Sequence, residues 1–261
     1  MCELLAMSAN VPTDIVFSFT GLIERGGKTG PHKDGWGITF YEGKGCRTFR
    51  DPLPSATSRV ARLVKEYPIK SEAVICHIRQ ANVGRISLEN THPFVRQLWG
   101  RNITFAHNGQ LKDYKEALET SWHEAVGESD SEQIFCFILE QLINTYGREK
   151  PPTDELFNTL TALCQKINQY GVFNTIMSDG EFVFCYCDTK LHWITRRAPF
   201  GPAKLIDTEM LVDFKEETTP NDVVTIIATQ PLTNDESWHK MAKGEAILFK
   251  LGEVIEQHTN N

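Results

Sequence analysis

The stretch VFNTIMSDGEFVFCYC, residues 172–187, has the pattern of two β-strands joined by a tight turn. The runs 172–177 and 181–187 are short and rich in β-branched and aromatic residues, which favour strands. Ser178-Asp179-Gly180 between them has the composition of a hairpin turn. The stretch therefore predicts an antiparallel pair, with Cys185 and Cys187 on one face as packing residues.

Similar strand-like runs occur along the rest of the chain, at residues 4–7, 36–41, 73–78, 103–106, 191–195, 223–228 and 246–250. Helical patterns are fewer and cover residues 13–21, 57–66, 131–144 and 153–169. Pro151-Pro152 separates the last two, because proline cannot continue a helix. Many antiparallel strands with two adjacent central helices predict an α+β layered fold. We expect residues 1–261 to form one domain, with a bend at 149–153.

Charge, hydropathy and cysteine content argue against several classes of protein. The net charge is -7, with 34 acidic against 27 basic residues, which argues against a nucleic-acid partner. No run of about 18 apolar residues occurs, and no basic segment precedes an apolar stretch at the start. We therefore expect no membrane segment, no signal peptide and a cytoplasmic location. The seven cysteines form neither a C-x-x-C pair nor a compact disulfide framework, so neither a metal centre nor another cofactor is predicted.

Cys2 directly follows Met1 and is a candidate N-terminal nucleophile. Removal of Met1 would leave a thiol and a free α-amino group on one residue, so that the amine could act as the base. A retained Met1 would acylate that amine and disable it. Two alternatives remain open from position alone: a buried small side chain in a first strand, or an acylation site.

Two further clusters follow apolar runs. Arg79 ends His77-Ile78-Arg79, and an arginine there meets a carboxylate either of a ligand or of the protein. In His107-Asn108-Gly109, the asparagine amide and the glycine N–H could converge on one anionic oxygen, as an oxyanion hole requires. The alternative for Asn108-Gly109 is a tight turn.

A third cluster, Ser129-Asp130-Ser131-Glu132, opens the predicted helix at 131–144. Ser129 and Glu132 have the spacing of a capping box, and Asp130 either favours the helix dipole or faces a substrate ammonium group. Upstream, the two glycines of Asp34-Gly35-Trp36-Gly37 indicate positive φ or close backbone approach. His77, His92 and His107 lack the spacing of zinc ligands.

Taken in order, these residues resemble the class-II glutamine amidotransferases, which are N-terminal nucleophile hydrolases. The segment 228–233, with Glu236 and Trp238, resembles the stand-alone YafJ-type branch and extends the resemblance along nearly the whole chain. The matching motifs are Met1-Cys2, Asp34-Gly35-Trp36-Gly37-Ile38, His77-Ile78-Arg79, Thr91-His92-Pro93-Phe94, His107-Asn108-Gly109 and Ser129-Asp130-Ser131-Glu132.

The resemblance implies a four-layer αββα sandwich of the N-terminal nucleophile hydrolase type. It also implies that Cys2 is the nucleophile and its α-amino group the base, that Arg79 holds the α-carboxylate of glutamine and Asp130 its α-ammonium, and that Asn108 and Gly109 form the oxyanion hole. The implied function is cleavage of the γ-amide of glutamine or a γ-glutamyl compound through a Cys2 thioester, without a cofactor.

Two alternatives remain: a γ-glutamyl peptide or amide hydrolase that releases an amine, and a non-catalytic γ-glutamyl-binding module. The partner implied is the small-molecule substrate, with a separate ammonia-accepting synthase as a second partner. Gln80 and Asn82 occupy positions where branches fused to a second domain usually carry an aromatic residue and a threonine. This difference favours the stand-alone hydrolase.

Overall fold

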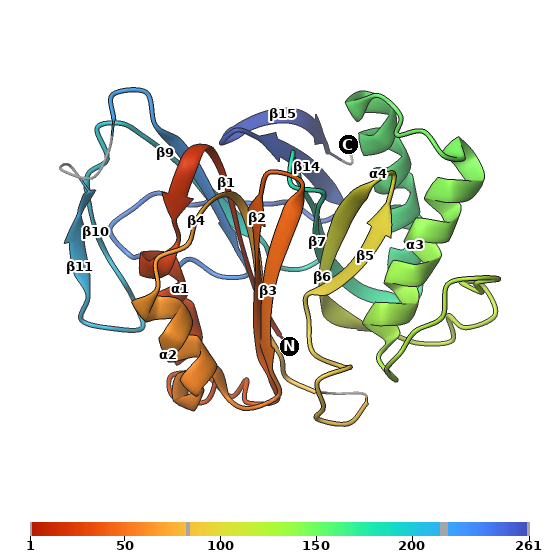
Figure 1. Ribbon diagram of the computed structural model, residues 1–261, viewed down its shortest axis with the longest axis horizontal. Coiled ribbons are helices and arrows are strands. Elements are labelled where there is room, and N and C mark those ends of the chain that lie inside the picture. The colour runs from red at the N-terminus through yellow and green to blue at the C-terminus, as the bar shows by residue number, and fades with distance from the viewer. Residues whose placement is uncertain (1, 82–83, 215–218, 260–261) are drawn as a thin grey trace.

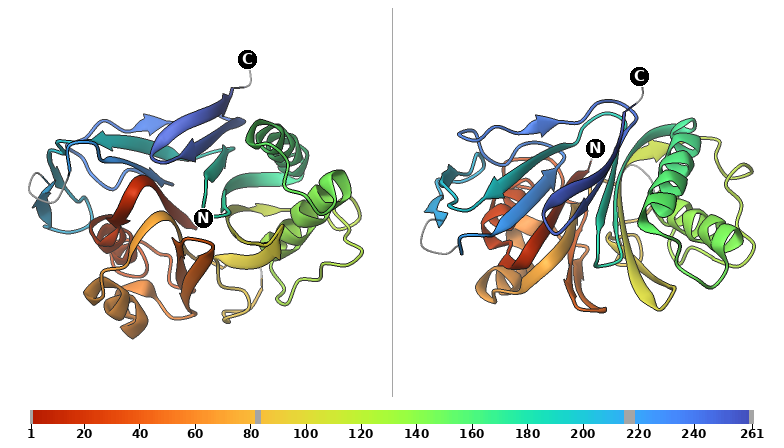
Figure 2. Two further views of the ribbon diagram at one scale, coloured as in Figure 1. Left: turned by 45° about the horizontal axis from the view of Figure 1, so that its top comes forward. Right: turned by 90° about the horizontal axis from the view of Figure 1, so that it is seen from above.

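The computed structural model describes residues 2–81, 84–214 and 219–259. Two antiparallel sheets pack face to face, and a helix pair covers the outer face of each (Figure 1). Figure 2 shows the two helix pairs on opposite sides of the molecule, with the sheets between them. The predicted αββα layering is therefore confirmed.

The first sheet has seven strands in the order β13-β9-β12-β1-β4-β2-β3. The second has six, in the order β15-β14-β8-β7-β6-β5, and β10 pairs with β11 separately. The strands of the first sheet are β1 (Glu3–Asp14), β2 (Trp36–Glu42), β3 (Gly45–Asp51), β4 (Lys70–Ile78), β9 (His192–Arg197), β12 (Val223–Ala228) and β13 (His239–Lys240). The others are β5 (Phe94–Leu98), β6 (Arg101–Leu111), β7 (Gly171–Ser178), β8 (Val183–Cys187), β10 (Pro202–Lys204), β11 (Leu211–Asp213), β14 (Glu245–Lys250) and β15 (Glu253–His258).

Helices α1 (Val16–Glu24) and α2 (Arg59–Glu66) cover the first sheet, and α3 (Asp130–Tyr146) and α4 (Thr153–Asn168) cover the second. A 3₁₀ turn, η1 (Ser55–Thr57), precedes α2. The four predicted helices are confirmed, although α1 begins three residues later than predicted because β1 continues through Asp14. Within the described residues, no helix combines the length and apolar character needed to cross a bilayer.

Three separate apolar clusters fill the spaces between the four layers. Side chains alternate along β1, so this strand contributes to two of the clusters. Leu5 and Met7 face α1, whereas Leu4 and Ala6 face the second sheet. The first seven residues of β1 are consequently all buried. A side chain at position 2 is in phase with those that face the space between the sheets.

The predicted hairpin at 172–187 is β7 and β8, with Ser178 paired to Val183 and Gly180 at φ +91°. Gly35 and Gly37 show the predicted positive φ and close backbone approach, respectively. Gly35 has φ +117°, and a Cβ on Gly37 would lie 2.4 Å from the His92 carbonyl oxygen.

Candidate active site

Four segments that are distant in sequence meet at one small cavity. Cys2 precedes β1, Arg79 follows β4, Gly109 lies near the end of β6, and Asp130 begins α3. The cavity has a volume of about 30 Å³, and its other lining residues are Gln80, Ala81, His92, His107, Gln110, Ser129 and Ser131. The register explains part of this convergence: Glu3 pairs with Ile78, which places Cys2 beside Arg79. The structure thus brings together four of the five predicted site residues as lining residues.

Cys2 is partly buried and bonds to the backbone of Gln80. The Gln80 N–H donates to Sγ at 3.3 Å, and the thiol donates to the Gln80 carbonyl oxygen at 3.5 Å. Burial raises the pKa of the Cys2 thiol, and the Gln80 hydrogen bond and the Arg79 charge oppose that shift. A thiol held protonated in this way requires a nearby base before it can attack a carbonyl. Of the two residues noted beside Arg79, Gln80 lies at the thiol, and Asn82 lies outside the described residues.

Arg79 and Asp130 place opposite charges at the same cavity. The Arg79 guanidinium donates to the carbonyl oxygens of Arg85, at 3.0 Å, and Gly84, at 3.4 Å. The Asp130 carboxylate accepts from the N–H groups of Leu111 and Ser131, at 2.9 and 2.8 Å. Asp130 therefore fastens the start of α3 to β6 while it lines the cavity.

The capping hypothesis is confirmed for Ser129, whose hydroxyl accepts from the Glu132 N–H at 3.3 Å. The reciprocal half of a capping box does not form. The Glu132 carboxylate instead accepts from the Gly127 N–H at 2.7 Å and pairs with Arg96.

The tight-turn alternative for Asn108-Gly109 is wrong, because both residues continue β6 and pair with Asn174 and Phe173 of β7. Asn108 is 1% exposed, and neither its side-chain nitrogen nor its oxygen has a hydrogen-bond partner in the described part of the chain. Ala106, two residues earlier, faces the space between the sheets, so Asn108 does too. A buried amide without partners costs about 1–3 kcal/mol, which a bound oxygen atom would offset.

Position 109 admits only glycine. A Cβ there would lie 1.8 Å from the Val172 carbonyl oxygen and 2.6 Å from His107 Nε2. The absence of a side chain lets the two strands pair and leaves the backbone of residue 109 at the cavity wall.

Two buried histidines, His92 and His107, line the cavity, and a third, His77, packs against His92. The His77 and His92 rings lie 4.2 Å apart, and His107 Nδ1 is 2.9 Å from Ser131 Oγ. Burial lowers the pKa of His77 to about 3, and it also lowers the pKa of His92 and His107. Their sequence signal was their position in the motifs His77-Ile78-Arg79, Thr91-His92-Pro93-Phe94 and His107-Asn108-Gly109.

These neutral histidines predict a loss of stability in acid. Their folded-state pKa lies below the unfolded value of about 6.5, so the unfolded chain binds more protons as the pH falls. The free energy of unfolding should therefore decrease from about pH 6.5 downward, by up to about 1.4 kcal/mol per pH unit for each such group. Urea titrations between pH 7.5 and 4.5 measure this slope.

The slope should be shallower in His92→Gln and unchanged in the control His239→Gln, because His239 is exposed. Equal slopes in the parent and His92→Gln would mean that His92 does not carry the effect.

The whole chain matches one family model. The matching model describes the class-II glutamine amidotransferases and covers residues 1–261. The chain belongs to this family. Its members act on the amide of glutamine, by transfer or by hydrolysis, and the family is one of enzymes with an N-terminal cysteine nucleophile.

Relatives of similar length support the assignment. The chain is 62% identical to YafJ of Escherichia coli strain K12 over 255 residues, which cover 98% of this chain and 100% of that protein. It is 46% identical to a Haemophilus influenzae Rd protein over 257 residues, covering 98% of this chain and 87% of the relative. The resemblance to the YafJ-type branch is thereby confirmed.

Solved structures confirm the fold. A predicted glutamine amidotransferase from Pseudomonas aeruginosa PA01 is 54% identical, with a TM-score of 0.80 and coverage of 98% of this chain and 100% of that one. Glutamine phosphoribosylpyrophosphate amidotransferase from B. subtilis is 15% identical, with a TM-score of 0.63 and coverage of 98% and 49%. That likeness establishes the N-terminal nucleophile hydrolase fold and no more.

Proposed function

We propose that this protein hydrolyses the γ-amide of glutamine through a thioester on Cys2. One observation carries the proposal: a cysteine thiol, an arginine and an aspartate of opposite charge line one cavity, and the buried, unpartnered amide of Asn108 directly precedes Gly109 at its wall. The charges of Arg79 and Asp130 complement the α-carboxylate and α-ammonium of a free amino acid. Neither a metal ion nor an organic cofactor takes part in the steps below.

Substrate entry requires rearrangement, because about 30 Å³ is roughly the volume of one water molecule. The guanidinium of Arg79 now bonds to the carbonyls of Gly84 and Arg85. A substrate carboxylate would replace these neutral partners with a stronger, bidentate one. Entry of glutamine is therefore coupled to displacement of the 84–85 segment.

Chemistry begins when the α-amine of Cys2, freed by removal of Met1, takes the thiol proton. Met1 itself lies outside the described residues. The thiolate attacks the γ-carbonyl carbon, and the resulting oxyanion accepts hydrogen bonds from the Asn108 amide and the Gly109 N–H. The tetrahedral intermediate collapses, the C–N bond breaks, and the ammonium of Cys2 returns the proton to departing ammonia. Water then attacks the thioester and releases glutamate, with the same amine as base.

Exposed apolar side chains near the cavity favour a second candidate, in which a separate synthase receives the ammonia. Ile86 and Leu88 follow the segment that binds Arg79, and they are 57% and 48% exposed. Val126, which precedes the cavity residue Ser129, is 76% exposed. An ion pair between Arg85 and Glu128 joins the segment of Ile86 and Leu88 to that of Val126. A partner that covers them would complete the site and protect the ammonia from solvent.

Steady-state assays on the isolated chain test the proposal, after N-terminal mass analysis has shown that Cys2 is the first residue. We expect release of ammonia from glutamine. Faster release of an amine from γ-glutamyl anilide would favour the amide hydrolase instead. A free Cys2 with no turnover of any γ-glutamyl amide would contradict the stand-alone hydrolase and favour a required partner or the binding module.

Arg79→Lys is expected to raise KM for glutamine at least about tenfold, because lysine keeps the charge but loses the bidentate fork. Asp130→Asn should have a similar effect, since it removes the charge that faces the ammonium. Initial rates over a range of glutamine concentrations measure both.

The matched controls are Arg47→Lys, on the exposed strand β3, and Asp154→Asn, in the first turn of α4. Both should keep the parent KM. If Arg79→Lys and Asp130→Asn both react with 6-diazo-5-oxo-norleucine as the parent does, the assignment of the clamp is wrong.

A further inference from the structure

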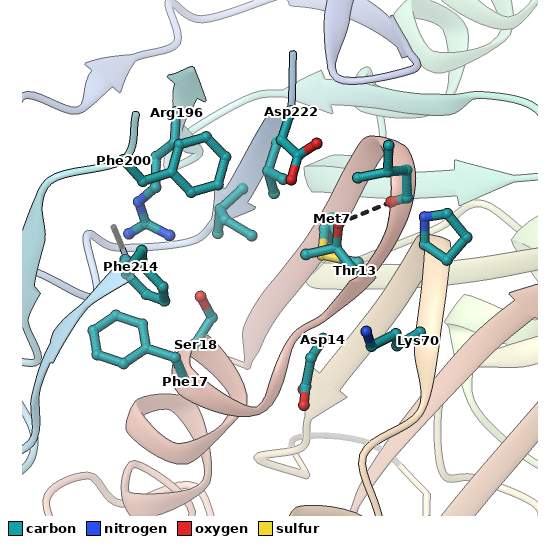
Figure 3. A pocket seen from close by; sticks show the side chains of 14 residues that line it. Met7, Thr13, Asp14, Phe17, Ser18, Lys70, Arg196, Phe200, Phe214 and Asp222 are labelled. Carbon is teal, nitrogen blue, oxygen red and sulfur yellow. Dashed lines mark hydrogen bonds between the residues drawn. The ribbon is translucent and has the colours of Figure 1, made fainter. Parts of the chain in front are cut away.

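A second and larger cavity lies on the helix-covered face of the first sheet (Figure 3). Its volume is about 340 Å³, within the range of small-molecule sites. Met7 of β1 and Val224 and Ile226 of β12 lie against it from the sheet. Met7 lies five residues after Cys2, roughly 17 Å along the strand, so the two cavities are separate.

One side of this cavity is aromatic. Phe17 comes from α1, and Phe200 and Phe214 from the segments that flank β10 and β11. The Phe214 ring centroid lies 5.1 Å from that of Phe17 and 6.4 Å from that of Phe200. The Arg196 guanidinium lies over the Phe17 and Phe214 rings, at 5.9 and 5.5 Å. This side offers an apolar, ring-lined recess for a side chain.

The charge of Arg196 is already neutralised. Its Nε and Nη2 donate to the two Glu236 carboxylate oxygens, at 2.7 and 2.6 Å. Glu236 also accepts from Thr233, whose hydroxyl in turn accepts from Trp238 Nε1 at 2.9 Å. Glu236 and Trp238 are the residues that resemble the YafJ-type branch, and neither lines the Cys2 cavity. Glu236 and Trp238 therefore help to hold Arg196 in the wall of the second cavity.

The opposite side of the cavity carries polar and charged groups that are available to a ligand. Figure 3 shows Ser18 between the rings and the pair Asp14 and Lys70. Ser18 is 4% exposed, and its hydroxyl has no hydrogen-bond partner among the described residues. Asp14 and Lys70 are exposed at the rim of the cavity. The Lys70 ammonium forms no ion pair with a described residue, and the Asp14 carboxylate accepts at Oδ1 from the Val16 N–H at 2.6 Å. The Ser18 hydroxyl lies at the cavity wall, where it can bond to a polar ligand that enters the cavity.

We propose that this cavity binds a free α-amino acid with a large apolar or aromatic side chain. The rings of Phe17, Phe200 and Phe214 would hold the side chain. The Asp14 carboxylate would hold the ammonium, and Lys70 the carboxylate, with the Ser18 hydroxyl as a further partner. Asp14 and Lys70 lie opposite each other in the β1–β4 pair. Two neighbouring charges of opposite sign beside one apolar recess match a zwitterion better than a simple amine or acid.

Isothermal titration calorimetry with L-phenylalanine and L-leucine tests this proposal. We expect saturable binding of one molecule per chain. Phenethylamine and 3-phenylpropionate, which each lack one charge, should bind at least about tenfold more weakly, since each loses a charge-assisted contact. Lys70→Ala and the cavity-filling Ser18→Leu should also weaken binding of phenylalanine at least about tenfold. Lys65→Ala on α2 is the matched control and should bind as the parent does.

The Asp130→Asn variant tests whether this site is independent of the Cys2 cavity. Binding of phenylalanine should be unchanged in that variant, whether or not the protein hydrolyses glutamine. Three results would overturn the proposal: no saturable binding, equal binding of phenethylamine, or binding lost in Asp130→Asn but kept in Lys70→Ala. Lys70 is exposed, so its variant keeps the test valid if Ser18→Leu fails to fold.

Discussion

Replacing Cys2 by alanine is expected to reduce glutamine hydrolysis by more than about 10³-fold, to the background rate. The substitution removes the sulfur that forms the thioester and leaves the α-amine in place, so no other group can take over the attack. The fold should persist, because the side chains are of similar size and Cys2 precedes β1. Ammonia release under saturating glutamine measures the loss, and circular dichroism confirms the fold.

Cys46→Ala is the matched control for this variant. Cys46 is also free and partly buried, but it lies on β3 and does not line the cavity. It should keep the parent rate and the parent reactivity toward 6-diazo-5-oxo-norleucine. Turnover by Cys2→Ala near the parent rate would exclude Cys2 as the nucleophile.

Asn108→Ala is expected to lower kcat by about 10²-fold or more while it changes KM little. The Asn108 amide is buried and unpartnered in the free protein, so its hydrogen bond would form only where charge develops on the substrate oxygen. An interaction made only in the transition state appears in kcat and not in KM. The same substitution should leave stability nearly unchanged, because no internal side-chain hydrogen bond is lost.

Asn102→Ala, on the same strand β6, is the matched control for Asn108→Ala. Its side chain donates to the Lys44 carbonyl oxygen at 3.3 Å and is remote from the cavity. We expect parent kinetics for this control. A folded Asn108→Ala protein with the parent kcat would show that the buried amide has a structural role instead.

Strands and helices with strong local patterns were predictable. The apolar runs of β1, β4, β6 and β7 are buried, and the stripe in α3 packs in the cluster between α3, α4 and the second sheet. The strands that the sequence did not reveal are β3, β5, β13 and β15, which lie at sheet edges, and the separate short pair β10 and β11. Their polar side chains produce no apolar run. They form because neighbouring strands supply their backbone hydrogen bonds.

The sequence by itself determined the layered α+β class and the motifs of the site, since these depend on the side chains of one segment at a time. Only the tertiary structure placed Cys2, Arg79, Gly109 and Asp130 at one cavity, because their meeting depends on strand register across distant segments. The buried amide of Asn108, the neutral histidines and the second cavity were likewise decided by packing. Burial, unlike local pattern, is a property of the whole fold.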